Sequence, residues 1–81
     1  MSARDFATAV VVHTETEAYF AQRHAQLEAG VLTLLRPGVQ RTATELRHAL
    51  NAGMREIARV LQSMRTRGLI RSQRRRWDLV S

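Results

Sequence analysis

The stretch from Thr42 to Arg71 reads TATELRHALNAGMREIARVLQSMRTRGLIR, and it decides the fold. Thr42 and Glu45 form a T-x-x-E capping box, in which each side chain binds a free backbone N–H at the start of a helix. Apolar residues then recur on one side of residues 43–50, which predicts a short helix with one buried face. Asn51 suits the left-handed position that ends a helix, so a sharp corner is expected at residues 51–53.

A second, amphipathic helix is predicted for residues 54–67. Its apolar positions recur with helical spacing: Ile57, Val60, Leu61 and Met64. Long polar side chains recur on the opposite side: Arg55, Arg59, Gln62 and Thr66. Gly68 occupies the favoured position after a helix end, so the helix should stop there.

Residues 69–79 change to the period of a strand. Trp77 and Leu79 alternate with Arg76 and Asp78, as in a half-buried strand. The polar segment 72–75 fits the tip of a hairpin, although it lacks the Asn-Gly or Gly-Gly pair typical of tight turns. The interpretation is a short, basic two-stranded ribbon.

This order of elements resembles the winged helix-turn-helix transcriptional regulators of bacteria, archaea and phages. The resemblance runs without a gap from Thr42 to Arg71 and continues in the Trp-Asp-Leu of the ribbon, about half of the chain. It implies a capped helix, a short turn, a recognition helix and a β-hairpin wing. The chain departs from the family at Gly53, where a capping Ser or Thr is usual, and in its short wing without a turn glycine.

The net charge of +6 is concentrated in the second half of the chain. Residues 1–41 carry four Arg and four acidic residues, whereas residues 42–81 carry nine Arg and three acidic residues; the chain has no Lys. Such asymmetry is expected of a protein that binds a polyphosphate. The alternative is an ordinary solvated surface in an Arg-rich protein.

Several site types are not indicated by the sequence. The chain has no Cys, its three His lack ligand spacing, and no phosphate-binding loop or catalytic arrangement is present. We therefore expect no enzyme activity, no catalytic residue, no metal, no cofactor and no small-molecule ligand. The first residues lack a long apolar run, so a cytoplasmic, nucleoid-associated protein without membrane contact is expected.

Residues 1–35 should supply the scaffold. Thr14 and Glu17 repeat the capping pattern, which predicts a helix from about Glu15 toward Leu35, kinked or divided at Gly30. Residues 1–14 form a separate extension in this interpretation; a short helix capped by Ser2, an edge strand at 9–12 and a frayed end all remain open. Adjacent Tyr19 and Phe20 indicate either a homodimer contact or two sides of one core.

The predicted fold is mainly α with a small β-hairpin: a three-helix winged helix-turn-helix domain over residues 15–81, with an extra N-terminal helix or extension. Residues 39–41 should add a minimal strand to the wing. The expected core consists of Leu27, Val31, Leu34, Leu35, Leu46, Leu50, Ile57, Leu61, Met64, Leu69 and Trp77.

The predicted partner is double-stranded DNA. Arg55 and Arg59 lie one turn apart near the start of the second helix, where recognition helices reach base edges, and Arg pairs bidentately with guanine. Glu56 either discriminates between bases or pairs with Arg59, and the pair is slightly favoured. The full set of expected DNA-binding residues is Thr42, Met54, Arg55, Glu56, Arg59, Gln62, Arg71, Arg74, Arg75 and Arg76.

Three functions fit these features. The first is a small homodimeric transcriptional regulator, with the wing arginines on phosphates or in the minor groove. The second is an excisionase-like architectural protein that binds repeated sites and bends DNA. The third is a winged helix that contacts an acidic protein. Trp77 either anchors the core or stacks on a base, and its alternation with Leu79 favours the core.

Overall fold

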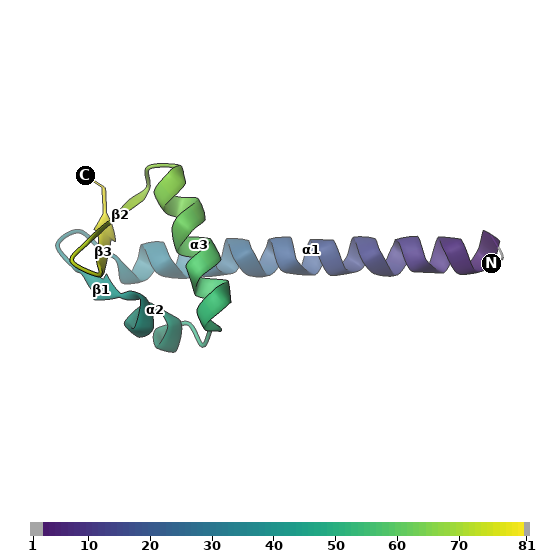
Figure 1. The fold of residues 1–81 in the computed structure, drawn as a ribbon, viewed down its shortest axis with the longest axis horizontal. Coiled ribbons are helices and arrows are strands. Elements are labelled where there is room, and N and C mark those ends of the chain that lie inside the picture. The colour runs from purple at the N-terminus through teal and green to yellow at the C-terminus, as the bar shows by residue number, and fades with distance from the viewer. Residues whose placement is uncertain (1–2, 81) are drawn as a thin grey trace.

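A computed structural model describes the backbone of residues 3–80 and the side chains of residues 17–80. The chain forms a long helix α1 (Ala3–Leu34), a short strand β1 (Arg41–Thr42), helices α2 (Ala43–Ala49) and α3 (Met54–Thr66), and a hairpin of β2 (Ile70–Gln73) and β3 (Arg76–Leu79). Figure 1 shows α2, α3 and the sheet gathered around the C-terminal part of α1, whose N-terminal part projects away from them. This is the expected mainly helical, winged-helix-like fold with a small sheet.

The three strands form an antiparallel sheet in the order β1-β3-β2. Arg41 lies opposite Trp77 across β1 and β3, while Ile70 lies opposite Leu79 across the hairpin. A minimal strand beside the wing was expected at residues 39–41, and it is found at residues 41–42. Thr42 therefore ends the strand and also caps α2.

Both ends of α2 use the residues that the sequence indicated. The Thr42 hydroxyl accepts a hydrogen bond from the Glu45 N–H, and the Glu45 carboxylate accepts one from the Thr42 N–H, which completes the capping box. Asn51 has a φ of 51°, and the N–H of Ala52 bonds the carbonyl of Arg47, as in a Schellman motif. Gly68, with a φ of 77°, ends α3 in the same way.

The core is built where α1, α2, α3 and the hairpin meet. Its buried members are Leu27, Val31, Leu35, Leu46, Ala52, Ile57, Val60, Leu61, Met64, Ile70 and Trp77. Leu34 and Leu50 are partly buried at its edge. The expectation for Leu69 was wrong: it is 40% exposed, whereas Ile70 is 1% exposed. The N–H of Leu69 bonds the carbonyl of Met64 and so belongs to the cap of α3. The strand starts one residue later, and Ile70 is its first side chain to point into the core.

Helix α1 differs most from expectation. It runs unbroken from Ala3 to Leu34, so it crosses the proposed boundary between residues 14 and 15, and the alternative of an edge strand at 9–12 was wrong. Thr14 lies inside the helix, where backbone N–H groups are bonded within it and a cap has no use. Ser2 lies outside the described residues. Gly30 does not divide the helix; it leaves room for Leu50, whose Cδ2 would lie 2.5 Å from an added Cβ.

The wing turns through two arginines. Gln73 pairs with Arg76, so the loop contains only Arg74 and Arg75, and their φ values are 53° and 66°. Positive φ at both loop positions matches the right-handed twist of a hairpin, as in a type I′ turn. Left-handed backbone is unfavourable for a residue with a Cβ, by roughly 1–2 kcal/mol. The chain therefore makes the tight two-residue turn although it lacks the Asn-Gly pair, and the backbone of Arg74 and Arg75 is strained as a result.

Replacing Arg74 by Asn and Arg75 by Gly together should stabilise the protein, because these residues tolerate the observed backbone. We expect the free energy of unfolding to rise by about 1–2 kcal/mol, measured by urea denaturation. Arg74→Gln with Arg75→Gln removes the same charges but keeps the strain. An equal gain in this control would show that relief of charge repulsion, and not backbone conformation, stabilises the variant.

Candidate functional site

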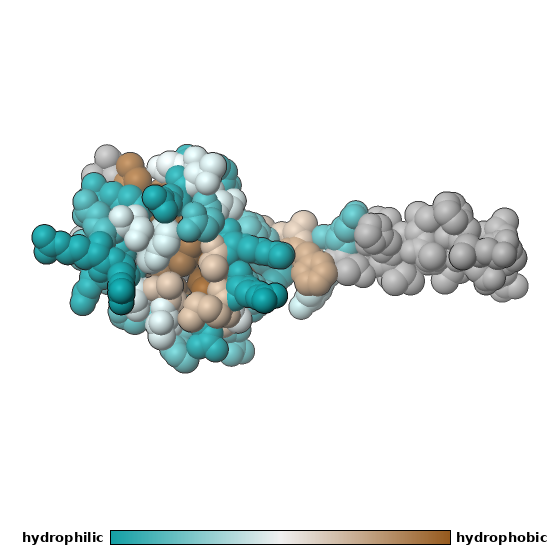
Figure 2. Space-filling view, in the orientation of Figure 1, coloured by the Kyte–Doolittle hydropathy of each residue, from teal (hydrophilic) through white to brown (hydrophobic). Residues whose placement is uncertain are grey.

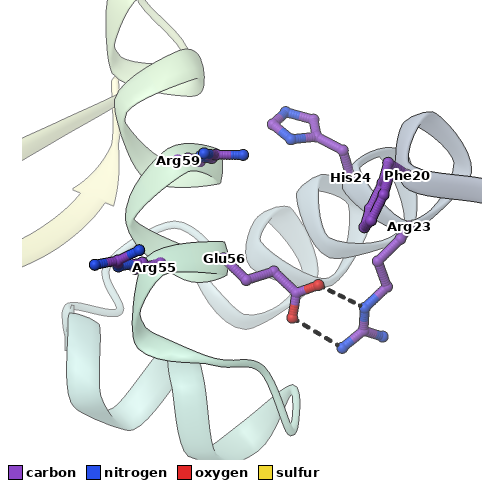
Figure 3. Close-up of a pocket in the computed structure, with 6 residues that line it drawn as sticks. All are labelled: Phe20, Arg23, His24, Arg55, Glu56 and Arg59. Carbon is purple, nitrogen blue, oxygen red and sulfur yellow. Dashed lines mark hydrogen bonds and ion pairs between the residues drawn. The ribbon is translucent and has the colours of Figure 1, made fainter. Parts of the chain in front are cut away.

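The outer side of α3 presents two arginines to solvent. Arg55 and Arg59 are exposed and lie one helical turn apart (Figure 3). Neither makes a hydrogen bond or ion pair with any side chain of residues 17–80. Gln62 is exposed further along the helix, and Met54 at its first position is 52% exposed. Four of the expected contact residues are therefore free to meet a partner.

Glu56 is held by a long-range contact. Its carboxylate accepts hydrogen bonds from Nε and Nη2 of Arg23 on α1, at 3.1 and 3.3 Å (Figure 3). It also accepts one from the N–H of Gly53 at 3.4 Å, so it caps the helix that Gly53 begins without a side chain. Arg23 donates further to the carbonyl of Asn51. The favoured pairing of Glu56 with Arg59 was wrong. Glu56 pairs instead with Arg23, whose guanidinium also binds the backbone of the corner at Asn51.

These contacts lower the pKa of Glu56. The hydrogen bond from Arg23 is the main cause, and the Gly53 N–H and the charge of Arg23 act in the same direction against partial desolvation. A carboxyl group with a lowered pKa stabilises the fold above its unfolded pKa, and this contribution disappears as the pH falls through the folded value.

The Glu56→Gln variant should therefore show a flatter dependence of stability on pH. Unfolding free energies of the two proteins should differ most near neutral pH and converge below the unfolded pKa of about 4.3. Urea denaturation between neutral pH and pH 3 measures this. Arg23→Gln, which removes the donor and keeps the carboxyl group, should flatten the pH dependence in the same way. Parallel curves for wild type and Glu56→Gln would contradict the assigned pairing.

The wing arginines differ in their availability. Arg71 donates to both carboxylate oxygens of Asp78, at 3.0 and 3.4 Å, and this pairing lowers the pKa of Asp78. Its donors are thus partly engaged within the hairpin, which the sequence did not indicate. Arg74 and Arg75 at the tip are exposed and have no bonded partner among residues 17–80. The tip is the most available part of the wing.

A polar hollow of about 670 Å³ lies beside the wing tip. Arg74 and Arg76 line it together with Gln40 from the loop before β1 and Gln73 from β2. Two guanidinium groups and two amides at one hollow suit a phosphate group. In Figure 2 strongly hydrophilic side chains project from this end of the folded part and also from the end nearer the projecting helix.

Thr42 is the least available of the expected contact residues. It is half-buried, and its hydroxyl both accepts from the Glu45 N–H and donates to the Glu45 carboxylate. The role of Thr42 as the cap of α2 explains why a threonine is found at this position.

Helix α1 contributes side chains that were not expected near α3. Phe20, Arg23 and His24 line a hollow of about 380 Å³ together with Arg55, Glu56 and Arg59 (Figure 3). The nearby rings of Tyr19 and Phe20 meet edge to face, with centroids 5.5 Å apart, and both residues are 63% exposed. The alternative that these two aromatics cover the core from two sides was therefore wrong. The sequence carried no signal for the meeting of Arg23 with Glu56, 33 positions apart.

Neither a metal site nor a membrane-spanning helix is found in the described part of the chain. Among these residues no three His, Asp or Glu side chains gather closely enough to hold a metal ion. No helix within residues 3–80 combines the length and apolar character needed to cross a bilayer.

Comparison with known proteins gives a similar solved structure. No family model and no curated protein matches the chain. The similar structure is the crystal structure of CalO1, a methyltransferase in calicheamicin biosynthesis, in its SAH-bound form. Identity is 27% with a TM-score of 0.59, and the match covers 100% of this chain but 24% of that one. The chain thus spans about a quarter of that enzyme, and the absence of enzyme activity stays a prediction.

Proposed function

We propose that the chain binds double-stranded DNA, with α3 in the major groove. The observation that carries the proposal is the pair Arg55 and Arg59, exposed, one turn apart and without protein partners in the described part of the chain. A major groove admits an α-helix, and arginine pairs bidentately with O6 and N7 of guanine. Two free guanidinium groups on one side of a surface helix are suited to this recognition.

The wing supplies the second contact in this proposal. Arg74, Arg75 and Arg76 are exposed, and all of the net positive charge lies in residues 42–81. Contacts with phosphates raise affinity for every sequence and position the helix, whereas contacts with base edges select the sequence. Sequence choice is therefore assigned to α3 and general affinity to the wing.

We further propose a homodimer formed through α1. The core of the folded part begins at Leu27, while Tyr19, on the projecting part and outside the hollow between α1 and α3, is 63% exposed. Aromatic residues with this exposure are typical of contact surfaces. A dimer with two-fold symmetry would bind a palindromic operator, as expected of a small transcriptional regulator in the cytoplasm. An excisionase-like protein would instead protect tandem repeats and bend the duplex.

The direct test is selection of binding sites from random duplex DNA at low salt, with the stoichiometry of the complex measured by light scattering. A palindromic consensus bound by two chains is the expected result. Direct repeats with strong bending would favour the architectural function. A chain that shifts no duplex in a gel, even at low salt, would contradict DNA binding.

A wing variant tests the division of roles. Replacing Arg74 and Arg75 by Gln should weaken binding to cognate and random duplexes alike, because phosphate contacts carry no sequence information. The slope of log affinity against log salt should fall by about 0.9 for each phosphate that the wing no longer neutralises. Fluorescence anisotropy at several salt concentrations measures this slope.

Arg65→Gln with Arg67→Gln is the control, because it removes the same number of charges as the wing variant. Arg65 lies in the last turn of α3 and Arg67 is paired with Glu28 of α1, so their replacement lowers the charge without touching the wing. An unchanged slope in the wing variant, or an equal change in the control, would show that the tip does not contact DNA.

A second candidate function is contact with another protein. A quarter of a methyltransferase covers the whole of this chain at 27% identity, so the same fold also serves within an enzyme. On this alternative the chain is a protein-contact module, and its arginines meet an acidic protein surface. The gel experiment separates the two, because a contact module leaves duplex DNA unshifted.

A further inference from the structure

The hollow between α1 and α3 brings together groups of complementary chemistry. It has a volume of about 380 Å³, within the usual range for small-molecule sites. We propose that it binds a small aromatic anion, with the negative group on Arg59 and the ring against Phe20. Figure 3 shows Phe20 of α1 and Arg59 of α3 on opposite walls.

The charge of the lining favours an anion. Three arginines and one glutamate leave an excess of two positive charges, before His24 is counted. Glu56 does not oppose an anion strongly, because its two oxygens are occupied by Arg23 and the N–H of Gly53. Arg55 and Arg59 keep all their donors for a ligand, since no side chain of residues 17–80 engages them. Charge-assisted, bidentate hydrogen bonds from guanidinium to a carboxylate or phosphate are the strong ones.

The apolar wall favours a ring. Phe20 is 63% exposed although it is a large apolar residue, so much of its ring is in contact with water. An aromatic ligand can stack against this ring and remove it from water. His24 forms the neighbouring wall, where its Nε2 lies 2.9 Å from the carboxylate of Glu28. A ligand that fits this hollow therefore carries both an aromatic ring, which contacts Phe20, and an anionic group, which binds arginine.

The test is titration calorimetry of the whole chain with four probes and no DNA. We expect 1-naphthoate or adenosine monophosphate to bind at least about tenfold more tightly than inorganic phosphate and than neutral 1-naphthalenemethanol. Tighter binding of the naphthoate indicates a carboxylate ligand, and tighter binding of the nucleotide indicates an aromatic phosphate. Equal binding of the neutral alcohol, or no heat from either aromatic anion, would overturn the proposal.

Matched variants locate the site. Phe20→Ala and Arg59→Gln should each weaken binding of the better anion by about tenfold. Leu32→Ala and Arg65→Gln change exposed residues of the same two helices outside the hollow and should leave binding unchanged. Thermal unfolding checks that all four variants are folded. Equal losses in the control variants would show non-specific association.

A ligand at this site would cover Arg59 and so compete with duplex DNA. This consequence rests on the proposed function, whereas the calorimetry does not. Anion binding by a chain that shifts no duplex would leave the ligand site standing and remove DNA binding. A chain that shifts duplex but binds neither aromatic anion would do the reverse.

Discussion

Replacing Trp77 with Ala should lower the free energy of unfolding by about 3–5 kcal/mol, enough to unfold much of a marginally stable domain. Trp77 is 9% exposed, and its strand β3 lies between β1 and β2 in the sheet. It faces Arg41 on one side and Ser72 on the other. The indole is thus the anchor that holds both neighbouring strands against the helices, as its alternation with Leu79 indicated.

Urea denaturation followed by circular dichroism measures the effect. Val80→Ala is the control, since Val80 directly follows the same strand but is 48% exposed. We expect the control to change stability by less than about 0.5 kcal/mol. A Trp77→Ala protein as stable as the control would mean that the indole does not anchor the sheet and is available to stack on a partner.

Local signals in the sequence predicted the local structure well. The capping box of Thr42 and Glu45, the left-handed Asn51 and the terminating Gly68 all lie where the sequence placed them. Each depends on backbone donors and acceptors within a few residues, so the amino-acid types alone carry the information. The apolar stripe of α3 was predicted equally well, because apolar residues recur with helical spacing over its whole length.

Contacts between segments distant in the chain could not be predicted from the sequence. Glu56 was assigned to Arg59 because pairs three or four residues apart meet on any helix. Arg23 competes from 33 positions away and reaches both the carboxylate and the corner. Only the packing of α1 across α3 brings it there. The hollow that Phe20, Arg23 and Arg55 line has the same origin, so no sequence pattern could have indicated it.

Glycine and turn residues were ambiguous for another reason. Gly30 fits either a kink or a close approach, and its helical propensity alone favours the kink. The structure shows the approach, of Leu50. Arg74 and Arg75 adopt the backbone of a tight turn without the residues that favour it, because the strands on both sides determine the register.

The Arg59→Ala and Arg55→Ala variants should each bind the cognate duplex more weakly by about 1–3 kcal/mol and show a relaxed preference at one base pair. The reason is the geometry of α3: both side chains are exposed near its start, and neither is engaged by another described side chain. By contrast, Arg71 shares its donors with Asp78, so Arg71→Ala should have the smaller effect on affinity.

The measurement is anisotropy with the selected duplex and with a set of single base-pair variants. Arg65→Ala is the matched control, because Arg65 is exposed on α3 but lies in its last turn. Recognition by the start of the helix requires the loss of discrimination to occur in the Arg55 and Arg59 variants and not in this control. If both variants keep the full sequence preference of the wild type, α3 does not read the bases, and the exposed arginines must serve the aromatic anion or an acidic protein instead.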